Sequence, residues 1–502
     1  LHFMTTNIYL FLYIVNKLLF LFIFSLLPGT FWQITDIHWD HKYSQQGDAT
    51  RMCHEGYLSS DSNGVYGNYL CDSPWPLVKS ALEAMVEIHN KPDFILWTGL
   101  VSIINSCLIM QTVQLDNAPH TDDPEPDFTV IFQTVANITG ELRSRFHESI
   151  PILPVLGNHD AYPRDNFPVA GDEFYGQYLS KGGWSSLLPE DAQQEFRNGG
   201  YYGYELPTGV TVSSYCMCED VILVVLVVNT NLYYGKNPLG IKADDPCGQF
   251  AWLRKRLETT QKKNSKVIIA AHAPPGYFER LAIIPYFNDT YNEAYVDLLN
   301  EFGTVIMAQI YGHEHTDSFK LFRAPEGDIK SAAFMAPSVT PCYRRSIPGK
   351  VAVNPSLRLY LYNSLANELL YEEKPIYDDM AELEVVKPEW DVYYRAREAY
   401  GLKSLDAVNM AQLYRRLMSD NRLFQEYYLR NSGGYTRFLD GPCDRDCKMH
   451  FMCSMVNIKS RDLDKCMGYV DYDTQKVGAQ KPQHIKPNIY SNETIHFNII
   501  PK

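Results

Sequence analysis

Histidine, aspartate and asparagine residues follow four apolar runs of the sequence, where their side chains could bind metal ions. The four sets are Asp36 with His38, Asn158 with His159, His272, and His313 with His315. Each apolar run is typical of a short buried strand that ends in a loop. In the first and last sets the two residues are two positions apart, so both side chains can face one side of an extended segment. One such histidine is ordinary, but four sets at successive strand ends predict a shared site.

Side chains of these types suit the hydrolysis of phosphate esters. Two divalent metals roughly 3.5–4 Å apart can acidify a water molecule, so that a hydroxide attacks phosphorus, and can neutralise the phosphoryl oxygens. Imidazole and carboxylate groups suit zinc, iron or manganese, and the neutral carbonyl oxygen of Asn158 ligates without adding charge. Such a site also needs a carboxylate shared between the two metals.

The elements that position these residues alternate between strands and helices. Apolar strand-like runs precede each set, and amphipathic helical patterns separate them at residues 73–90, 128–146, 248–261 and 292–302. This alternation predicts an α/β fold with ligands at strand ends. From about residue 375 the pattern becomes helical, with Ser404 as a candidate N-cap, and four cysteines follow between residues 443 and 466. We therefore expect a helical, disulfide-stapled region at 375–470, and a polar tail at 471–502.

Composition limits the class of partner. The 502 residues are 45% hydrophobic and carry a formal net charge of −14. A chain of this length can form one large α/β domain and a smaller region. The negative charge argues against binding a nucleic-acid polymer, which requires a basic face. A small phosphoester stays compatible, because bound metals supply local positive charge.

Several features predict passage through the secretory route. Residues 1–29 are rich in Leu, Phe and Ile, which is typical of a signal peptide or of an uncleaved hydrophobic leader. Glycosylation sequons occur at Asn137, Asn288 and Asn492. In an oxidising compartment the clustered cysteines would form disulfides, although a structural zinc knuckle is an alternative. We expect an extracellular or lysosomal protein.

Longer motifs carry a resemblance to a known family. The stretches "FWQITDIHWD", "LGNHD", "NTNLYYGKN", "AAHAPPGYF", "YGHEHTDSF" and "APSVTP" occur in this order, and the cysteine cluster follows. Over roughly residues 30–470 the chain resembles the acid sphingomyelinase-like phosphodiesterases, a branch of the calcineurin-like metallophosphoesterases. The resemblance implies a layered β-sandwich flanked by helices over residues 30–374.

The resemblance also implies the site. Two Zn²⁺ ions would be bound, one by Asp36, His38 and His315 and the other by Asn158, His272 and His313. His159 would stay unligated and contact the phosphate or the leaving group. The implied disulfides are Cys53–Cys71, Cys443–Cys447 and Cys453–Cys466.

One position departs from the family pattern. In the family, "WTG" is followed by the bridging Asp and, four residues later, by a His that can protonate the leaving oxygen. Here Leu100 follows Gly99, and the same Asp-to-His spacing returns at Asp116 and His120. Residues 100–115 are therefore interpreted as an insertion, either a retained intron or a genuine loop, which leaves Asp116 as the bridge and His120 as a catalytic residue. The remaining alternative is that the bridging carboxylate is lost.

The predicted function is that of a secreted zinc-dependent phosphodiesterase acting on nucleotides or on phosphodiester lipid head groups. The first metal motif directly follows the leader, so no saposin domain is expected, and a monomer is expected. A monoesterase of the purple acid phosphatase type would need a tyrosine three residues after the bridging Asp, where Pro119 stands. A secreted binding protein with an impaired site is the alternative if the bridge is lost.

Overall fold

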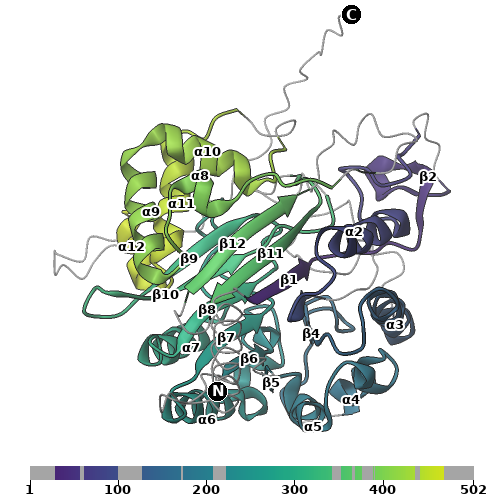
Figure 1. Ribbon diagram of the computed structural model, residues 1–502, viewed down its shortest axis with the longest axis horizontal. Coiled ribbons are helices and arrows are strands. Elements are labelled where there is room, and N and C mark those ends of the chain that lie inside the picture. Colours follow the sequence, from purple (N-terminus) through teal and green to yellow (C-terminus); the bar gives the residue numbers. More distant parts are fainter. Residues whose placement is uncertain are drawn as a thin grey trace, which may run out of the picture.

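The computed structural model describes residues 29–56, 62–99, 127–170, 173–206, 222–341, 352–363, 368–375, 388, 390–435 and 441–468. Two β-sheets with helices around them form its centre (Figure 1). The expected α/β fold with two layered sheets is confirmed.

The first sheet has five strands in the order β12-β11-β1-β3-β4. Their bounds are β1 Gly29–Thr35, β3 Phe94–Thr98, β4 Ile152–Val155, β11 Ser356–Asn363 and β12 Glu368–Pro375. Strands β1, β3 and β4 are parallel, with Thr35 paired to Thr98 and Thr98 to Val155. Their carboxyl ends therefore reach one edge of the sheet together, which brings the loops after β1 and β4 close to each other.

The second sheet has six strands in the order β5-β6-β7-β8-β10-β9. Their bounds are β5 Tyr202–Glu205, β6 Leu223–Val228, β7 Lys266–Ala271, β8 Ile306–Tyr311, β9 Ser318–Arg323 and β10 Ile329–Met335. Strands β6, β7 and β8 are parallel, so the loops after β7 and β8 also leave from one edge. A separate strand, β2 (Tyr43–Asp48), lies beside the first disulfide.

Helices cover the sheets on the outside. They are α2 Trp75–Ile88, α3 Phe128–Arg145, α4 Glu173–Ser180, α5 Glu190–Gly199, α6 Gln249–Lys262, α7 Asp289–Glu301, α8 Ala396–Tyr400, α9 Ala407–Ser419, α10 Asn421–Asn431, α11 Arg445–Val456 and α12 Ser460–Cys466. Those predicted from the 3.6-residue periodicity are present, because each buries an apolar face against the sheets or a neighbouring helix. No pattern predicted α4 and α5, which lie between β4 and β5.

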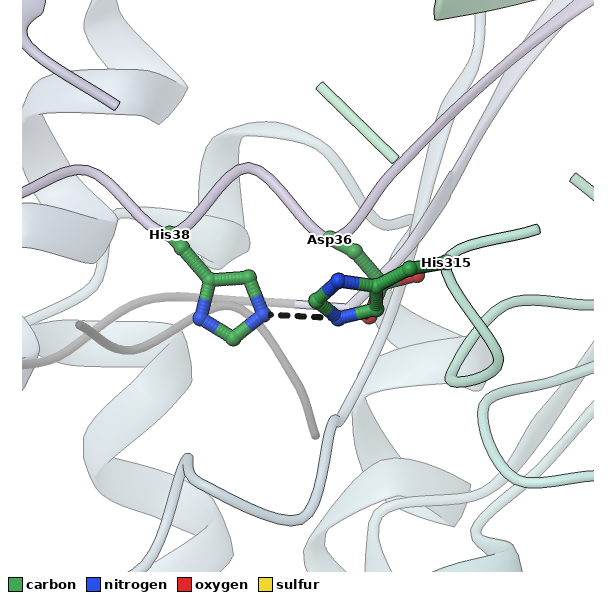
Figure 2. A group of neighbouring side chains, drawn as sticks. All are labelled: Asp36, His38 and His315. Atoms are coloured by element: carbon green, nitrogen blue, oxygen red, sulfur yellow. Dashed lines mark hydrogen bonds and ion pairs between the residues drawn. The ribbon is translucent and has the colours of Figure 1, made fainter. Parts of the chain in front are cut away.

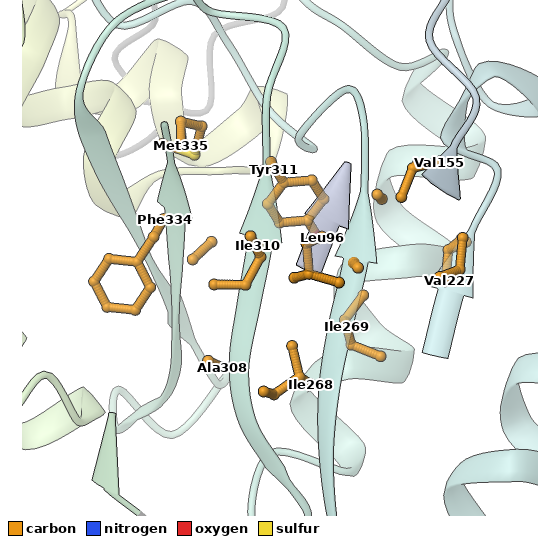
Figure 3. Packing of buried hydrophobic residues seen from close by; sticks show 14 of the residues in the cluster. Leu96, Val155, Val227, Ile268, Ile269, Ala308, Ile310, Tyr311, Phe334 and Met335 are labelled. Atoms are coloured by element: carbon orange, nitrogen blue, oxygen red, sulfur yellow. The ribbon is translucent and has the colours of Figure 1, made fainter. Parts of the chain in front are cut away.

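The apolar strands pack face to face. Val227, Ile269 and Ile310 of the second sheet lie in one buried cluster with Leu96 and Val155 of the first (Figure 3). Strands buried on both faces read as continuous apolar runs rather than as alternating ones. This burial makes the strand ends a rigid support for the polar residues that follow them.

Helices α8–α12 form a region on one side of the sheets, beside β9 and β10 (Figure 1). The three disulfides implied by the resemblance are present, and two of them, Cys443–Cys447 and Cys453–Cys466, staple this region. The clustered cysteines are therefore paired rather than arranged around a zinc ion. Ser404 is not the N-cap of α9. Asp406 is, and its side chain accepts a hydrogen bond from the Asn409 amide.

Among the residues that the structure describes, no helix is long and apolar enough to cross a membrane.

Candidate active site

The carboxyl ends of β1 and β3 in one sheet and of β7 and β8 in the other meet at a single place. The Gln33 side chain of β1 donates hydrogen bonds to the Thr98 hydroxyl of β3, at 2.9 Å, and to the Tyr311 carbonyl of β8, at 2.8 Å. The carbonyl oxygen of Thr98 lies 3.2 Å from His272 Nδ1, at the end of β7. The two sheets are thus joined by hydrogen bonds at the place where the candidate ligands begin.

The first predicted ligand set is brought together. One ligand atom each from Asp36, His38 and His315 lies within 4.8 Å of the other two, and all three side chains are buried. His38 Nε2 lies 3.1 Å from His315 Nε2, and the Asp36 carboxylate lies beside the His315 ring (Figure 2). His38 and His315 are 277 positions apart in the sequence, so only the packing of the two sheets brings them together.

Asp36 is the negative centre of this group. Its Oδ2 accepts hydrogen bonds from the Thr35 hydroxyl, at 2.7 Å, and from the His313 backbone amide, at 3.0 Å. Complete burial alone would raise the pKa of the Asp36 carboxyl. The His315 and His272 imidazoles and the Thr35 hydroxyl outweigh this effect, so the pKa lies below its ordinary value.

The backbone at the paired ligands is not extended, which corrects the reasoning from their two-residue spacing. Asp36, His38, His313 and His315 have φ angles of 49°, 41°, 71° and 63°, all in the left-handed region. This region is unfavourable for residues with a Cβ and persists only where the surroundings enforce it. The ligand loops are therefore held in a strained conformation that directs the side chains inward, as is common at functional sites.

Gly312 allows the close approach of these loops. A Cβ atom at this position would lie 2.1 Å from the Thr35 hydroxyl oxygen, 2.7 Å from Asp36 Oδ2 and 2.8 Å from the Thr98 carbonyl oxygen. Only a residue without a side chain fits between β1, β3 and the end of β8.

The second predicted ligand set is partly visible through His272 and His313. His272 Nε2 lies 3.1 Å from His313 Nδ1. Because a carbonyl oxygen can only accept a hydrogen bond, the contact with Thr98 places the proton of neutral His272 on Nδ1. Its Nε2, which lies next to His313 Nδ1, then carries the lone pair that a metal ion would accept. Second-sphere hydrogen bonds orient metal-binding histidines in this way.

Asn158 and His159 follow β4 and are buried at the same edge. The Asn158 Nδ2 donates a hydrogen bond of 2.7 Å to Asp165 Oδ1, which fixes the orientation of the amide. The His159 ring lies edge-on to the His38 ring, with centroids 5.9 Å apart. The structure therefore places the His159 ring beside the first predicted ligand set.

These residues fit divalent metal ions. Within the described part of the chain, no hydrogen-bond donor reaches the buried Asn158 Oδ1, and Asp36 Oδ1 lies 3.4 Å from His315 Nε2. Buried polar atoms are normally satisfied, so an oxygen left in this state indicates a ligand position. Two pairs of facing imidazole nitrogens add nitrogen donors that suit zinc or iron.

Asp116, His120 and Asn492 lie outside the described residues. The structure does describe the strand that leads toward the first two. The Thr98 carbonyl oxygen contacts both Thr35 Oγ1, at 2.5 Å, and His272 Nδ1, and Gly99 follows with a φ angle of 136°. The chain thus leaves β3 between the two ligand sets, which is where a bridging carboxylate would be needed.

Comparison with known proteins agrees with this geometry. A family model described as calcineurin-like phosphoesterase matches residues 29–317, and one described as acid sphingomyelin phosphodiesterase C-terminal region matches residues 328–472. The chain is 32% identical over 444 residues to acid sphingomyelinase-like phosphodiesterase 3b of Homo sapiens, covering 88% of this chain and 90% of that one. The chain belongs to the acid sphingomyelinase-like phosphodiesterases.

Two further relatives show the breadth of names in this family. Cyclic GMP-AMP phosphodiesterase of Homo sapiens is 29% identical over 442 residues, covering 88% of this chain and 90% of the relative. Sphingomyelinase phosphodiesterase C of Dictyostelium discoideum is 30% identical over 452 residues, covering 88% and 92%. As an acid sphingomyelinase-like phosphodiesterase, the chain is a phosphoric diester hydrolase of the metallophosphoesterase class.

Reasoning from sequence missed residues that orient the candidate ligands of this phosphodiesterase. Asp165 orients Asn158, and Thr98 orients His272 through a backbone carbonyl that no sequence pattern can assign. Gly312 lies inside the "YGHEH" motif, where a glycine next to a ligand was a usable signal.

Proposed function

We propose that the chain is a secreted phosphodiesterase that binds two zinc ions and cleaves phosphodiester bonds of nucleotides or of lipid head groups. The observation that carries the proposal is the meeting of two pairs of imidazole nitrogens, each 3.1 Å apart, at the joined edges of two sheets. Asp36 and Asn158 add oxygen atoms as candidate ligands, and among the described residues no hydrogen-bond donor reaches Asn158 Oδ1.

The ligands divide into two sets. Asp36, His38 and His315 would hold one ion, Asn158, His272 and His313 would hold the other, and Asp116 would bridge them. When bound, such a pair acidifies a water molecule and neutralises the phosphoryl oxygens.

The side chains would donate the proton to the leaving group and hold the candidate ligands in place. His159, beside the first set, and His120 would supply the proton to the leaving oxygen. The Thr98 carbonyl keeps the His272 proton on Nδ1, which holds its Nε2 ready to ligate. The strained loops of Asp36 and His313 fix the ligand geometry before the substrate arrives.

The substrate class follows from the relatives and from the charge of the chain. Relatives are named for cyclic GMP-AMP and for sphingomyelin, which share a phosphodiester group. Small phosphodiesters suit a chain with a net charge of −14, because its positive charge would be concentrated at the metals.

Secretion is supported by the three disulfides and by the described sequons. Asn288 caps α7 through its Oδ1, which accepts a hydrogen bond from the Thr290 amide. A glycan on Nδ2 would leave this cap intact. Asn137 similarly uses its Oδ1, which accepts from the Gln133 side chain.

The test is hydrolysis of bis-p-nitrophenyl phosphate with added zinc, by the full chain and by a form lacking residues 100–115. Activity confined to the deleted form would identify residues 100–115 as an artefact or an inhibitory insertion and Asp116 as the bridge. Activity in both would identify a tolerated loop. Absence of activity in both folded proteins would contradict the proposal and favour a binding protein.

Two variants control this assay. His272→Ala removes a candidate ligand and is expected to abolish zinc-dependent hydrolysis, whereas His147→Ala changes an exposed histidine after α3 and should leave it unchanged. The preferred substrate is then found by comparing turnover of a cyclic dinucleotide with turnover of sphingomyelin.

A further inference from the structure

Asn431, the last residue of α10, is completely buried between two loops of the active site. Its Nδ2 donates hydrogen bonds to the Glu279 carboxylate and, at 2.8 Å, to the Asp317 carbonyl. Its Oδ1 accepts a hydrogen bond of 2.8 Å from Arg280 Nε. Its backbone carbonyl accepts another, of 2.9 Å, from the Asp317 amide.

These partners belong to the segments that carry metal ligands. Glu279 and Arg280 lie in the loop that follows β7 and His272, and Asp317 lies two residues after His315. Glu279 also accepts a hydrogen bond of 3.0 Å from the hydroxyl of Thr316, the residue next to His315. One side chain of α10 therefore ties the segment after β7 to the segment after β8.

Two further contacts from the C-terminal part of the chain hold Asp317, in the segment after β8. The Tyr394 hydroxyl donates a hydrogen bond to Asp317 Oδ2, while Arg358 of β11 forms an ion pair of 2.5 Å with Asp317 Oδ1. Asp317 is the last residue matched by the calcineurin-like phosphoesterase model. Asn431, Tyr394 and Arg358 all fall within the match to the C-terminal region.

This arrangement bears on the metal ligands because their loops are strained. His313 and His315 adopt left-handed backbone conformations, which relax unless the surrounding structure holds them. The amide of Asn431 supplies a donor and an acceptor in a fixed geometry, at a site where water cannot replace either.

We propose that Asn431 is a positioning residue through which the C-terminal helical region sets the placement of residues 313–317, and with it the metal affinity of the site. The inference rests on the proposed metal-dependent function. Asn431 itself contacts neither metal nor substrate.

The test is the Asn431→Asp variant, which has nearly the same shape. It replaces the Nδ2 donor with an acceptor and places a second carboxyl group against Glu279. The matched control is Asn421→Asp, the same change at the exposed first residue of α10. The double variant N431D/E279Q exchanges the two groups, so that one amide again faces one carboxyl group.

Zinc affinity is measured by competition with a chelator, and the ligand geometry by the visible spectrum of the cobalt-loaded protein. N431D is expected to bind zinc at least tenfold more weakly with an altered cobalt spectrum. N421D should match the wild type, and N431D/E279Q should recover to within about threefold. The thermal unfolding midpoint of the chelator-treated proteins separates loss of metal binding from loss of folding.

The outcomes are distinct. Wild-type affinity and spectrum in folded N431D would overturn the inference, while the wild type, measured in the same series, would still support the proposed function. A wild type that binds no metal would refute the proposed function, and the inference with it. If N431D does not fold, Asn431→Ser tests the same contacts, because it removes the Nδ2 donor and the Oδ1 acceptor without placing a carboxyl group against Glu279. Weaker zinc binding in folded N431S supports the inference, and unchanged binding overturns it.

Discussion

Replacing Gly312 with alanine should damage the active site while leaving the fold in place. The added Cβ would lie 2.1 Å from the Thr35 hydroxyl oxygen and 2.8 Å from the Thr98 carbonyl oxygen. The hydroxyl would have to retreat by more than 1 Å, and its contacts with Asp36 Oδ2 and with the Thr98 carbonyl oxygen would be lost. The carbonyl cannot move alone, because it is part of β3. Alanine is acceptable to the Gly312 backbone, so the effect is steric.

The expected magnitude follows from these overlaps. Overpacking a buried position by one methyl group typically lowers the free energy of unfolding by about 1–3 kcal/mol. A displacement of about 1 Å at a reacting centre lowers the rate roughly 100-fold. We therefore expect G312A to fold, with kcat/KM for bis-p-nitrophenyl phosphate reduced about 100-fold and with weaker zinc binding.

The control is Gly140→Ala in α3. A Cβ at Gly140 would meet no atom within 4 Å, and alanine in a helix is favoured over glycine by about 0.5–1 kcal/mol. G140A should be fully active and slightly more stable. Full activity and zinc binding in G312A would refute the claim that close approach at this glycine sets the ligand geometry.

Three further predictions concern pH, amide orientation and a disulfide. Burial, followed by the Glu314 carboxylate, raises the pKa of Glu279 from 4.5 to about 8. The native state therefore holds a proton that the unfolded state has lost, and the stabilisation is complete below about pH 4.5 and lost as pH rises through 8. Between these two pH values, the free energy of unfolding should fall by about 1.4 kcal/mol per pH unit, as measured by urea titration. A similar slope in E279Q would contradict the assignment of this pH dependence to Glu279. Asp165→Leu should weaken zinc binding 10–100-fold, because the Asn158 amide is no longer oriented. D165N keeps an acceptor for the Asn158 amide and should bind zinc nearly as well as the wild type. Equal zinc content in the two variants would count against the orienting role of Asp165. Replacing both cysteines of Cys53–Cys71, which closes an 18-residue separation, with serine should lower the free energy of unfolding by about 3 kcal/mol, and denaturation curves that superimpose would argue otherwise.

The type of site was already evident in the linear pattern of residues. Apolar runs ending in Asp36, Asn158, His272 and His313 predicted buried strands with candidate ligands at their ends, since strand burial and strand-end loops depend on local pattern. The cysteine pairs also followed, through resemblance. The extended conformation expected for the "DIH" and "HEH" segments was wrong, because the packing of two sheets imposes left-handed angles that local preference disfavours.

The sequence alone determined which chemical groups are present, in which order, and at which strand ends they would appear. The resemblance implied that Asp36 and His315 belong to one group, and the tertiary structure brings them together. Only the tertiary structure decided that Gly312 must lack a side chain and that Asn431 ties together two loops that carry candidate ligands. Each of these facts joins residues far apart in the chain, and Asn431 lies 152 positions from Glu279. Periodicity and spacing report on neighbours along the chain, whereas ligand geometry depends on distances that the packed core fixes between its two sheets.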